Sequence, residues 1–417
     1  MNLFRKNKIY LDYASATQVN KSVAKKMAFY ERKFFANPTA IHEEGVEVRN
    51  IIEASREKIA KLLNAHNDEI IFTGSGTESD ALAILGIVKS VSMSDMDKKF
   101  LPHIITTKIE HPAVLENCRM LEERGEAEVS YISVDKMGIV NLEELKDSLK
   151  ENTVLVSVMY ANNEIGTIQP IEEIAKIIRH FKKIQSGKHK DFFGLSFPLF
   201  HTDACQAMNY LFTENIEKLG VDLMSFNSSK IYGPKGVGVL YKKRNVNLAP
   251  LYKGGGQEFG LHSGTESVSL IAGVAEALSI TNKIKQKESE RLVKIRDYGI
   301  EKLLSLSKTF PYKIVLNGSL EVRLPNNINI SIYGISSELL VVELSARGIF
   351  ISEKSACKSD DPNESYVISA IRKVCLRKDG EVEGSLRISL GRDTKTKDMD
   401  SLFNAFKNIF EKYKMWK

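Results

Sequence analysis

The chain has 417 residues, of which 43% are hydrophobic and 27% are charged. These proportions are those of a globular protein with enough apolar material for a sizeable core, and the length favours two domains over one. The net charge is +6, from 59 Lys and Arg against 53 Asp and Glu. So mild an excess is explained by a lysine-rich solvated surface, and no motif supports direct nucleic-acid binding.

Neither a membrane span nor a secretion signal is indicated. No stretch approaches the roughly 18 apolar residues of a membrane span, and the N-terminal sequence MNLFRKNKIYLDYASAT lacks the apolar core of a signal peptide. We therefore expect a cytoplasmic protein without a membrane partner. The four cysteines form no C-x-x-C pair and the eight histidines show no metal-ligand spacing, so no metal site is expected.

Strand-like and helix-like segments alternate over residues 49–241. The predicted strands are 69–73, 103–107, 127–134, 153–160, 199–204, 221–227 and 236–241, and the predicted helices are 49–63, 77–88, 112–125 and 171–183. This alternation predicts an α/β fold with a mostly parallel sheet covered by helices on both faces. In such sheets, ligands bind beyond the carboxyl ends of the strands.

The pattern changes from about residue 266. A long helical stretch at 270–306 leads into a strand at 327–334 and a final helix. We therefore expect a large cofactor-binding domain at 17–265, and a smaller α+β domain formed by 1–16 and 266–417. The segment 182–198 connects a predicted helix to a predicted strand and is longer than most such connections. We expect it to form a surface excursion.

The predicted strand ends carry polar residues that each have an ordinary explanation. GSGTESD at 74–80 is a glycine-rich helix entry suited to an anion, although Ser75 or Thr77 could simply cap the helix. His111 precedes a proline, and a lone histidine is usually structural. Paired asparagines, such as Asn162 and Asn163, usually only make a turn.

Two further groups of polar residues lie next to predicted strands. Asp203 and Gln206 come directly after an apolar strand, where an acid is costly unless it meets a cation. Lys230 is set among small residues in SFNSSKIYGPKGVGVLY, just before another strand. A phosphate cradle, a stacking ring, amides, a carboxylate and a lysine together suit pyridoxal phosphate (PLP), whose aldehyde binds lysine. Burial lowers the pKa of such an amine, so that it acts as nucleophile and base.

At these residues the sequence resembles the class V aminotransferase-like family of fold-type I PLP enzymes, and within it the cysteine desulfurases. The resemblance extends almost from end to end and includes ten motifs in family order. They are YLDYASAT, NPTAIH, FTGSGTESD, EHPAV, NNEIG, HTDACQA, DLMSFNSSKIYGPKGVG, GGGQEFGLHSGTES, SACKS and LRISLGR.

The resemblance implies a role for each cofactor-binding residue. Lys230 matches the Schiff-base lysine, and Asp203 matches the acid that keeps the pyridine nitrogen protonated. Gln206 matches the amide bonded to the ring hydroxyl, and His111 matches the imidazole stacked on the ring, which is also a candidate proton carrier.

The resemblance also assigns the phosphate and substrate sites. Gly76 and Thr77 match the phosphate loop, and Thr265 matches a threonine that reaches the phosphate of a neighbouring subunit, which implies a homodimer. Asn163 and Arg387 match the clamp on the substrate carboxylate, where a guanidinium grips the two oxygens.

Cys357 decides the implied activity. It lies in EKSACKSDDPNESY, where Lys354 and Lys358 argue against burial and favour the thiolate. The resemblance implies that Lys230 removes the α-proton of L-cysteine and that Cys357 then attacks the substrate sulfur. The products are alanine and a persulfide on Cys357, whose sulfur passes to an acceptor protein for iron–sulfur assembly or tRNA thiolation.

Several positions depart from the family pattern. Ser229 stands where the family has histidine, and its hydroxyl can bond phosphate but carries no charge. Asn227 replaces a serine, His262 replaces a common arginine, and Cys205 replaces a threonine as a small packing residue. Two alternatives therefore stay open: a selenocysteine lyase-type enzyme of the same family, for which Cys357 is dispensable, and a non-catalytic scaffold for sulfur transfer.

Overall fold

The computed structural model describes residues 8–94, 101–185, 196–353, 365–372 and 383–414. Its largest element is a seven-stranded sheet with the order β2-β8-β7-β6-β5-β3-β4. The strands are β2 (Ile70–Thr73), β3 (His103–Thr107), β4 (Glu128–Ile132), β5 (Thr153–Ser157), β6 (Leu199–Asp203), β7 (Leu223–Asn227) and β8 (Gly238–Lys242). Strand β8 runs antiparallel to its two neighbours, β2 and β7, and the other four pairs of this sheet are parallel. The expected mostly parallel sheet is therefore confirmed.

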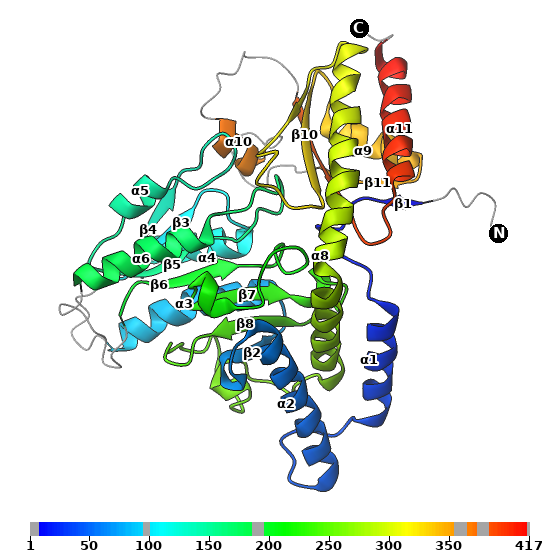
Figure 1. Ribbon diagram of the computed structural model, residues 1–417. Helices are drawn as coiled ribbons and strands as arrows, with labels where there is room; N and C mark the ends of the chain where they lie inside the picture. The colour runs from blue at the N-terminus through cyan, green and yellow to red at the C-terminus, as the bar shows by residue number, and fades with distance from the viewer. Residues whose placement is uncertain (1–7, 95–100, 186–195, 354–364, 373–382, 415–417) are drawn as a thin grey trace.

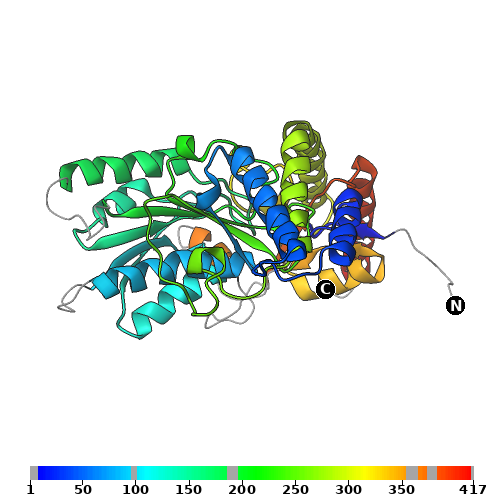
Figure 2. The same ribbon diagram turned by 90° about the horizontal axis from the view of Figure 1, so that it is seen from below.

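Helices cover both faces of this sheet, as Figures 1 and 2 show. Because side chains alternate between the faces of a strand, Ile71 and Leu155 point to one helical layer while Phe72 and Val156 point to the other. The first layer consists of α3 (Gly76–Ser94) and α4 (Pro112–Glu123). The second contains α2 (Glu43–Leu63), α6 (Ile171–Gln185), α7 (Ile216–Leu219) and part of α8 (Val268–Ser305).

A second, antiparallel sheet has the order β12-β13-β10-β9. It is built from β9 (Ile314–Leu316), β10 (Asn327–Tyr333), β12 (Ser352–Glu353) and β13 (Glu383–Ser389), and it packs on α9 (Ser337–Ala346) and α11 (Thr396–Lys414). The N-terminal β1 (Ile9–Tyr10) pairs with β11 (Ile349–Phe350), and Asp12 bridges to Ser389. The start of the chain therefore lies beside its C-terminal sheet.

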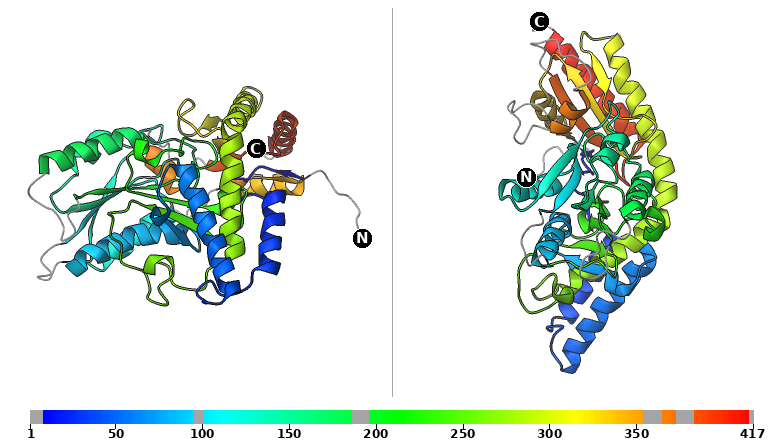
Figure 3. Two further views of the ribbon diagram at one scale, coloured as in Figure 1. Left: turned by 60° about the horizontal axis from the view of Figure 1, so that its bottom comes forward. Right: turned by 90° about the vertical axis from the view of Figure 1, so that its left-hand side faces the viewer.

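Helix α8 joins the two cores. It is a single helix of 38 residues, and Figure 3 shows it running past α1 (Lys21–Lys33) and α2 toward the smaller sheet. Val274 and Leu278 belong to the core of the large sheet, whereas Leu292 and Leu303 belong to the core of the small one. One continuous helix thus holds the small sheet against the large one.

Two expectations of the sequence analysis concern segments that are only partly described. Most of the segment 182–198, namely residues 186–195, lies outside the described residues. Cys357 and the residues around it also lie outside them. None of the helices in the described part of the chain is long and apolar enough to cross a membrane. The division into domains at residue 265 stays a prediction.

Candidate active site

The carboxyl ends of the parallel strands bring the predicted site residues to one edge of the large sheet. Strand β6 ends at Asp203, which pairs in register with Ser225 on β7, and β7 itself ends two residues later at Asn227. His111 follows β3, and Asn163 follows β5. The topology alone therefore places four segments around one site, as the rule for open α/β sheets requires.

Lys230 stands at the end of a single helical turn, η2 (Ser228–Lys230), directly after β7. The Asn227 side chain caps this turn, because its Oδ1 accepts hydrogen bonds from the Lys230 backbone N–H at 3.2 Å and from Ser229 Oγ at 3.2 Å. The Lys230 ammonium donates to the backbone oxygen of Ser15. The position of the lysine is thus fixed at both ends.

The surroundings of Lys230 lower its pKa. Burial is the largest cause, and the nearby Arg387 guanidinium adds to it, whereas Cys205, Asp203 and Asp12 oppose it. Because the neutral amine is the form that attacks carbonyl groups and accepts protons, this environment suits a nucleophile and base.

The glycine-rich entry of α3 forms an anion cradle beside this lysine. A Cβ on Gly76 would lie 2.9 Å from Cys205 Sγ and 3.0 Å from Asn227 Nδ2, so only glycine fits there. Within the described residues, no group accepts a hydrogen bond from the backbone N–H of Gly76 or Thr77. Two amides at a helix N-terminus therefore remain available for a phosphate.

Asp203 is the carboxylate at the floor of the site. Its Oδ1 accepts a hydrogen bond from the Cys205 backbone N–H at 2.8 Å. Behind it lie two buried carboxyl groups: burial and then the charge of Asp203 raise the pKa of Asp80, and burial raises the pKa of Glu110 to about 8. Like charges this close do not all ionise, so the cluster favours one charged member.

Two further predicted site residues, His111 and Gln206, are held by hydrogen bonds. His111 is the N-cap of α4, and its Nδ1 accepts a hydrogen bond from the Ala113 backbone N–H at 3.1 Å. The amide Nε2 of Gln206 donates to the Ala14 oxygen at 3.0 Å. Both side chains also have local structural roles, and these roles fix their orientation.

Arg387 contacts Asn163. Arg387 is 4% exposed, and its Nη1 donates to the Asn163 backbone oxygen at 3.1 Å. Its Nη2 donates to Asp12 Oδ1 at 2.9 Å and to Ser15 Oγ at 2.6 Å. Its buried Nε and the buried Oδ1 of Asn163 have no hydrogen-bond partner in the described structure. Unpaired buried polar atoms of this kind mark a place for a polar ligand.

Within the described residues, Thr265, Ser229 and the cysteines make no hydrogen bond to Lys230 or Arg387. Thr265 is exposed on the loop that precedes α8. Ser229 has its hydroxyl bonded to Asn227, and the buried Cys118 has its pKa raised to about 12 by burial. Cys357 lies outside the described residues.

Asp12 and Ser15 both contact Arg387, and neither was assigned a role from the sequence. Their signal was available in the motif YLDYASAT, but a motif does not show which of its residues reaches the site. Asp80 was also missed, although an acid on the apolar face of a helix, in TESDALAI, indicates a buried role.

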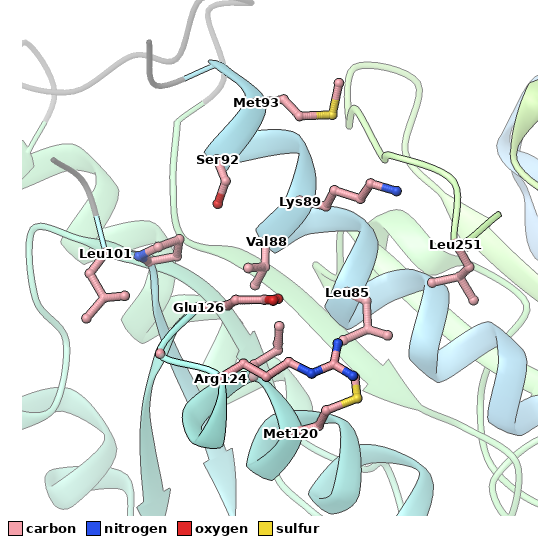
Figure 4. Close-up of a pocket in the computed structure, with 13 residues that line it drawn as sticks. Leu85, Val88, Lys89, Ser92, Met93, Leu101, Met120, Arg124, Glu126 and Leu251 are labelled. Atoms are coloured by element: carbon pink, nitrogen blue, oxygen red, sulfur yellow. The ribbon is translucent and has the colours of Figure 1, made fainter. Parts of the chain in front are cut away.

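A cavity lies away from these residues. A cavity of about 660 Å³ separates the C-terminal parts of α3 and α4, with Lys89 and Val88 on one side and Met120 and Arg124 on the other (Figure 4). The predicted site uses the opposite, N-terminal ends of the same two helices. The cavity is therefore not part of the active site. No group of three or more potential metal ligands occurs among the residues that the structure describes.

The fold and the site together define a PLP-dependent enzyme of fold type I: a partly buried lysine of lowered pKa, a carboxylate at the end of the neighbouring strand β6 and an amide-lined phosphate cradle at one sheet edge. The chain belongs to the class-V aminotransferase family, whose model matches residues 9–402.

Two curated relatives with a named activity are similar to nearly the whole of this chain. A cysteine desulfurase IscS of Dictyoglomus turgidum is 40% identical over 410 residues, which are 98% of this chain and 95% of the relative. A cysteine desulfurase IscS 1 of Archaeoglobus fulgidus is 38% identical over 403 residues, 97% of each.

Two solved structures superpose on most of this chain. A NifS-like protein superposes with a TM-score of 0.82 at 34% identity, covering 97% of this chain and 99% of its own. A structure of SspA in complex with cysteine superposes with a TM-score of 0.73 at 32% identity, covering 92% and 98%.

Proposed function

We propose that this protein is a PLP-dependent cysteine desulfurase, which converts L-cysteine to L-alanine and collects the sulfur as a persulfide on Cys357. The observation that carries the proposal is the grouping of three residues at the edge of the sheet: Lys230 and Arg387 both donate to Ser15, and Asp203 ends the strand beside β7, which leads to Lys230. The similarity to cysteine desulfurases over nearly the whole chain supports this choice within the family.

The chain's own residues suit each part of the cofactor. Lys230 would hold the aldehyde carbon, Asp203 would keep a proton on the ring nitrogen, and the Gly76 and Thr77 amides would hold the phosphate. His111 would lie against the ring and Gln206 would bond its hydroxyl. Ser229 would add a phosphate contact, and Thr265 would reach the phosphate of a second subunit in a homodimer. When bound, the cofactor supplies an electron sink for the carbon skeleton of the amino acid.

Arg387 and Asn163 bind the substrate carboxylate. The Arg387 guanidinium is already held by Asp12 and Ser15, so it meets the substrate in a fixed orientation. The Nε atom of Arg387 is also buried and has no hydrogen-bond partner in the described structure. A charge-assisted hydrogen bond from a buried guanidinium to a carboxylate is strong. The substrate is thereby oriented with its α-carbon toward Lys230.

Two residues of the chain move the proton and the sulfur. The neutral amine of Lys230 accepts the α-proton of the substrate at Nζ. The Cys357 thiolate then forms an S–S bond with the substrate sulfur, and the bond between this sulfur and the β-carbon breaks. The electron pair stays with the carbon skeleton, which takes up protons and leaves as alanine.

The persulfide then passes to an acceptor protein for iron–sulfur assembly or for a tRNA-thiolation enzyme, in the cytoplasm. The functional test measures alanine and sulfide released from L-cysteine in the presence of a thiol reductant. The account expects equal amounts of both. Release of alanine by the Cys357→Ala variant at the full rate would instead favour a selenocysteine lyase-type enzyme, and no release from protein loaded with PLP would favour a scaffold.

Replacing Arg387 by alanine is expected to raise KM for L-cysteine by roughly 10- to 100-fold, because a charge-assisted bond to the carboxylate is lost. The measurement is steady-state alanine release over a range of L-cysteine concentrations. The control is Arg119→Ala, which removes an exposed arginine paired with Glu116. An unchanged KM in the Arg387 variant would contradict the assigned clamp.

A further inference from the structure

The loop between β8 and α8 carries Thr265 and is attached to the large domain's first elements at two places, once to α2 and β2 and once to the first turn of α3. At the first, the Arg56 guanidinium donates to both oxygens of Glu258, at 2.7 and 2.8 Å, and Glu258 also accepts a bond from the Phe72 backbone N–H at 2.8 Å. Arg56 and Glu258 are 3% and 4% exposed, and the rings of Phe72 and Phe259 lie near the guanidinium. This attachment is a buried, bidentate ion pair.

The second attachment is centred on Glu78, in the first turn of α3. Its Oε1 lies 3.2 Å from His262 Nε2 and 3.1 Å from the Tyr252 hydroxyl. Its Oε2 accepts a bond from the Gly74 backbone N–H at 2.7 Å, and its own N–H donates to Ser75 Oγ at 3.1 Å. Ser75 thus caps the helix, and the Glu78 carboxylate ties back to the residue before this cap, so Glu78 helps to set the shape of the turn that contains the Gly76 and Thr77 amides.

The two attachments differ in how they respond to pH. An arginine stays charged at any ordinary pH, whereas a histidine titrates near neutrality. The hydrogen bond with Glu78 raises the pKa of His262, and burial opposes it. The other groups that face His262 are Tyr252, Glu258 and Glu266, all on its own loop, and the two glutamates also favour its charged form.

The charge on His262 matters because Glu78 stands beside an anion site. A bare carboxylate one turn from the Gly76 and Thr77 amides repels a phosphate, and a cation held at 3.2 Å from that carboxylate cancels the repulsion. The protonated imidazole also keeps the carboxylate in place as a cap, so that both effects strengthen phosphate binding.

We propose that His262 is a positioning residue for the cofactor phosphate: when protonated, it holds and neutralises Glu78 and so maintains the phosphate cradle. The proposal rests on the proposed function only in that Gly76 and Thr77 hold the phosphate of PLP. Because the pKa of His262 is raised, its charge is present below the ordinary histidine range and is lost as the pH rises through the raised pKa. Affinity for PLP is therefore expected to fall over that interval.

The test measures the dissociation constant of PLP for the cofactor-free protein, from about pH 6 to about pH 9, in three forms of the chain. The His262→Arg variant keeps a permanent charge and the His262→Gln variant keeps a donor without charge. We expect the Arg variant to match the wild type near pH 6 and to bind about three- to tenfold more tightly near pH 9. The Gln variant is expected to bind more weakly than the wild type near pH 6 and to match it near pH 9.

Two controls separate the phosphate from other effects of pH. Pyridoxal, which lacks the phosphate, is expected to bind the three forms equally at each pH. His180→Arg makes the same charge change on an exposed face of α6 and is expected to keep the wild-type pH dependence. A ratio between wild type and the Arg variant that stays constant with pH, or the same pH-dependent difference with pyridoxal, would overturn the proposal.

The assay contains no L-cysteine, so its result does not depend on desulfurase activity. Failure of the wild type to bind PLP at any pH would refute the proposed function and this inference together. Binding of PLP with a constant ratio between the wild type and the Arg variant would refute this inference alone.

Discussion

Lys230→Ala is expected to lower the release of alanine from L-cysteine by more than about a thousandfold, because no other amine takes over as both covalent anchor and base. Lys230 is the lysine whose pKa is lowered beside Asp203 and Arg387. The measurement is alanine release under saturating L-cysteine by protein preloaded with PLP.

A matched control for this variant is Lys242→Ala, which removes another lysine whose pKa burial lowers, at the end of β8. It is expected to keep most of the activity. A small added amine is expected to restore part of the rate of the Lys230 variant, since it replaces the missing base. A Lys230 variant that retains a tenth or more of the wild-type rate, about 1.4 kcal/mol of barrier, would remove this lysine from its assigned role.

Asp203→Asn is expected to lower kcat by about 100- to 10,000-fold, because an amide cannot hold the proton on the ring nitrogen that a carboxylate holds. The substitution keeps the size of the side chain, and its oxygen can still accept the bond from the Cys205 backbone N–H. The measurement is kcat for alanine release, together with the PLP content of the purified variant.

Asp80→Asn provides the matched control, because Asp80 lies behind Asp203 and its pKa is raised by burial and by the charge of Asp203. A carboxyl group whose pKa is raised in this way loses less when it becomes an amide than one whose role requires a charge. We expect the Asp80 variant to stay within about fivefold of the wild type. An Asp80 variant as impaired as the Asp203 variant would show that the charge belongs to the cluster rather than to Asp203.

The sequence predicted the large sheet well because buried strands between two helical layers are short, apolar and bounded by turn residues. The ends of elements were harder to predict. The strand expected at 153–160 ends at Ser157, because the Met159 backbone N–H bonds to the Glu110 carboxylate instead of a neighbouring strand. Helix α2 begins at Glu43, earlier than expected, because His42 caps it through Nδ1.

The candidate site could be predicted where residue type and position on the sheet agree. Asp203 ends β6 and Lys230 comes shortly after the adjacent parallel strand β7, so their closeness follows from topology. The attachment of Arg387 to Asp12 could not be predicted, because it depends on the N-terminal residues pairing with the small sheet at the far end of the chain. The pairing of His262 with Glu78 likewise depends on tertiary packing that no local pattern records.

The most direct test of the central claim is the mass of the peptide that contains Cys357, measured after PLP-loaded protein reacts with L-cysteine without reductant. The account predicts that this peptide gains the mass of one sulfur atom, that a thiol reductant removes it, and that the Lys230→Ala variant never gains it. Formation of alanine while this peptide stays unmodified would contradict a persulfide on Cys357 and with it the proposed mechanism.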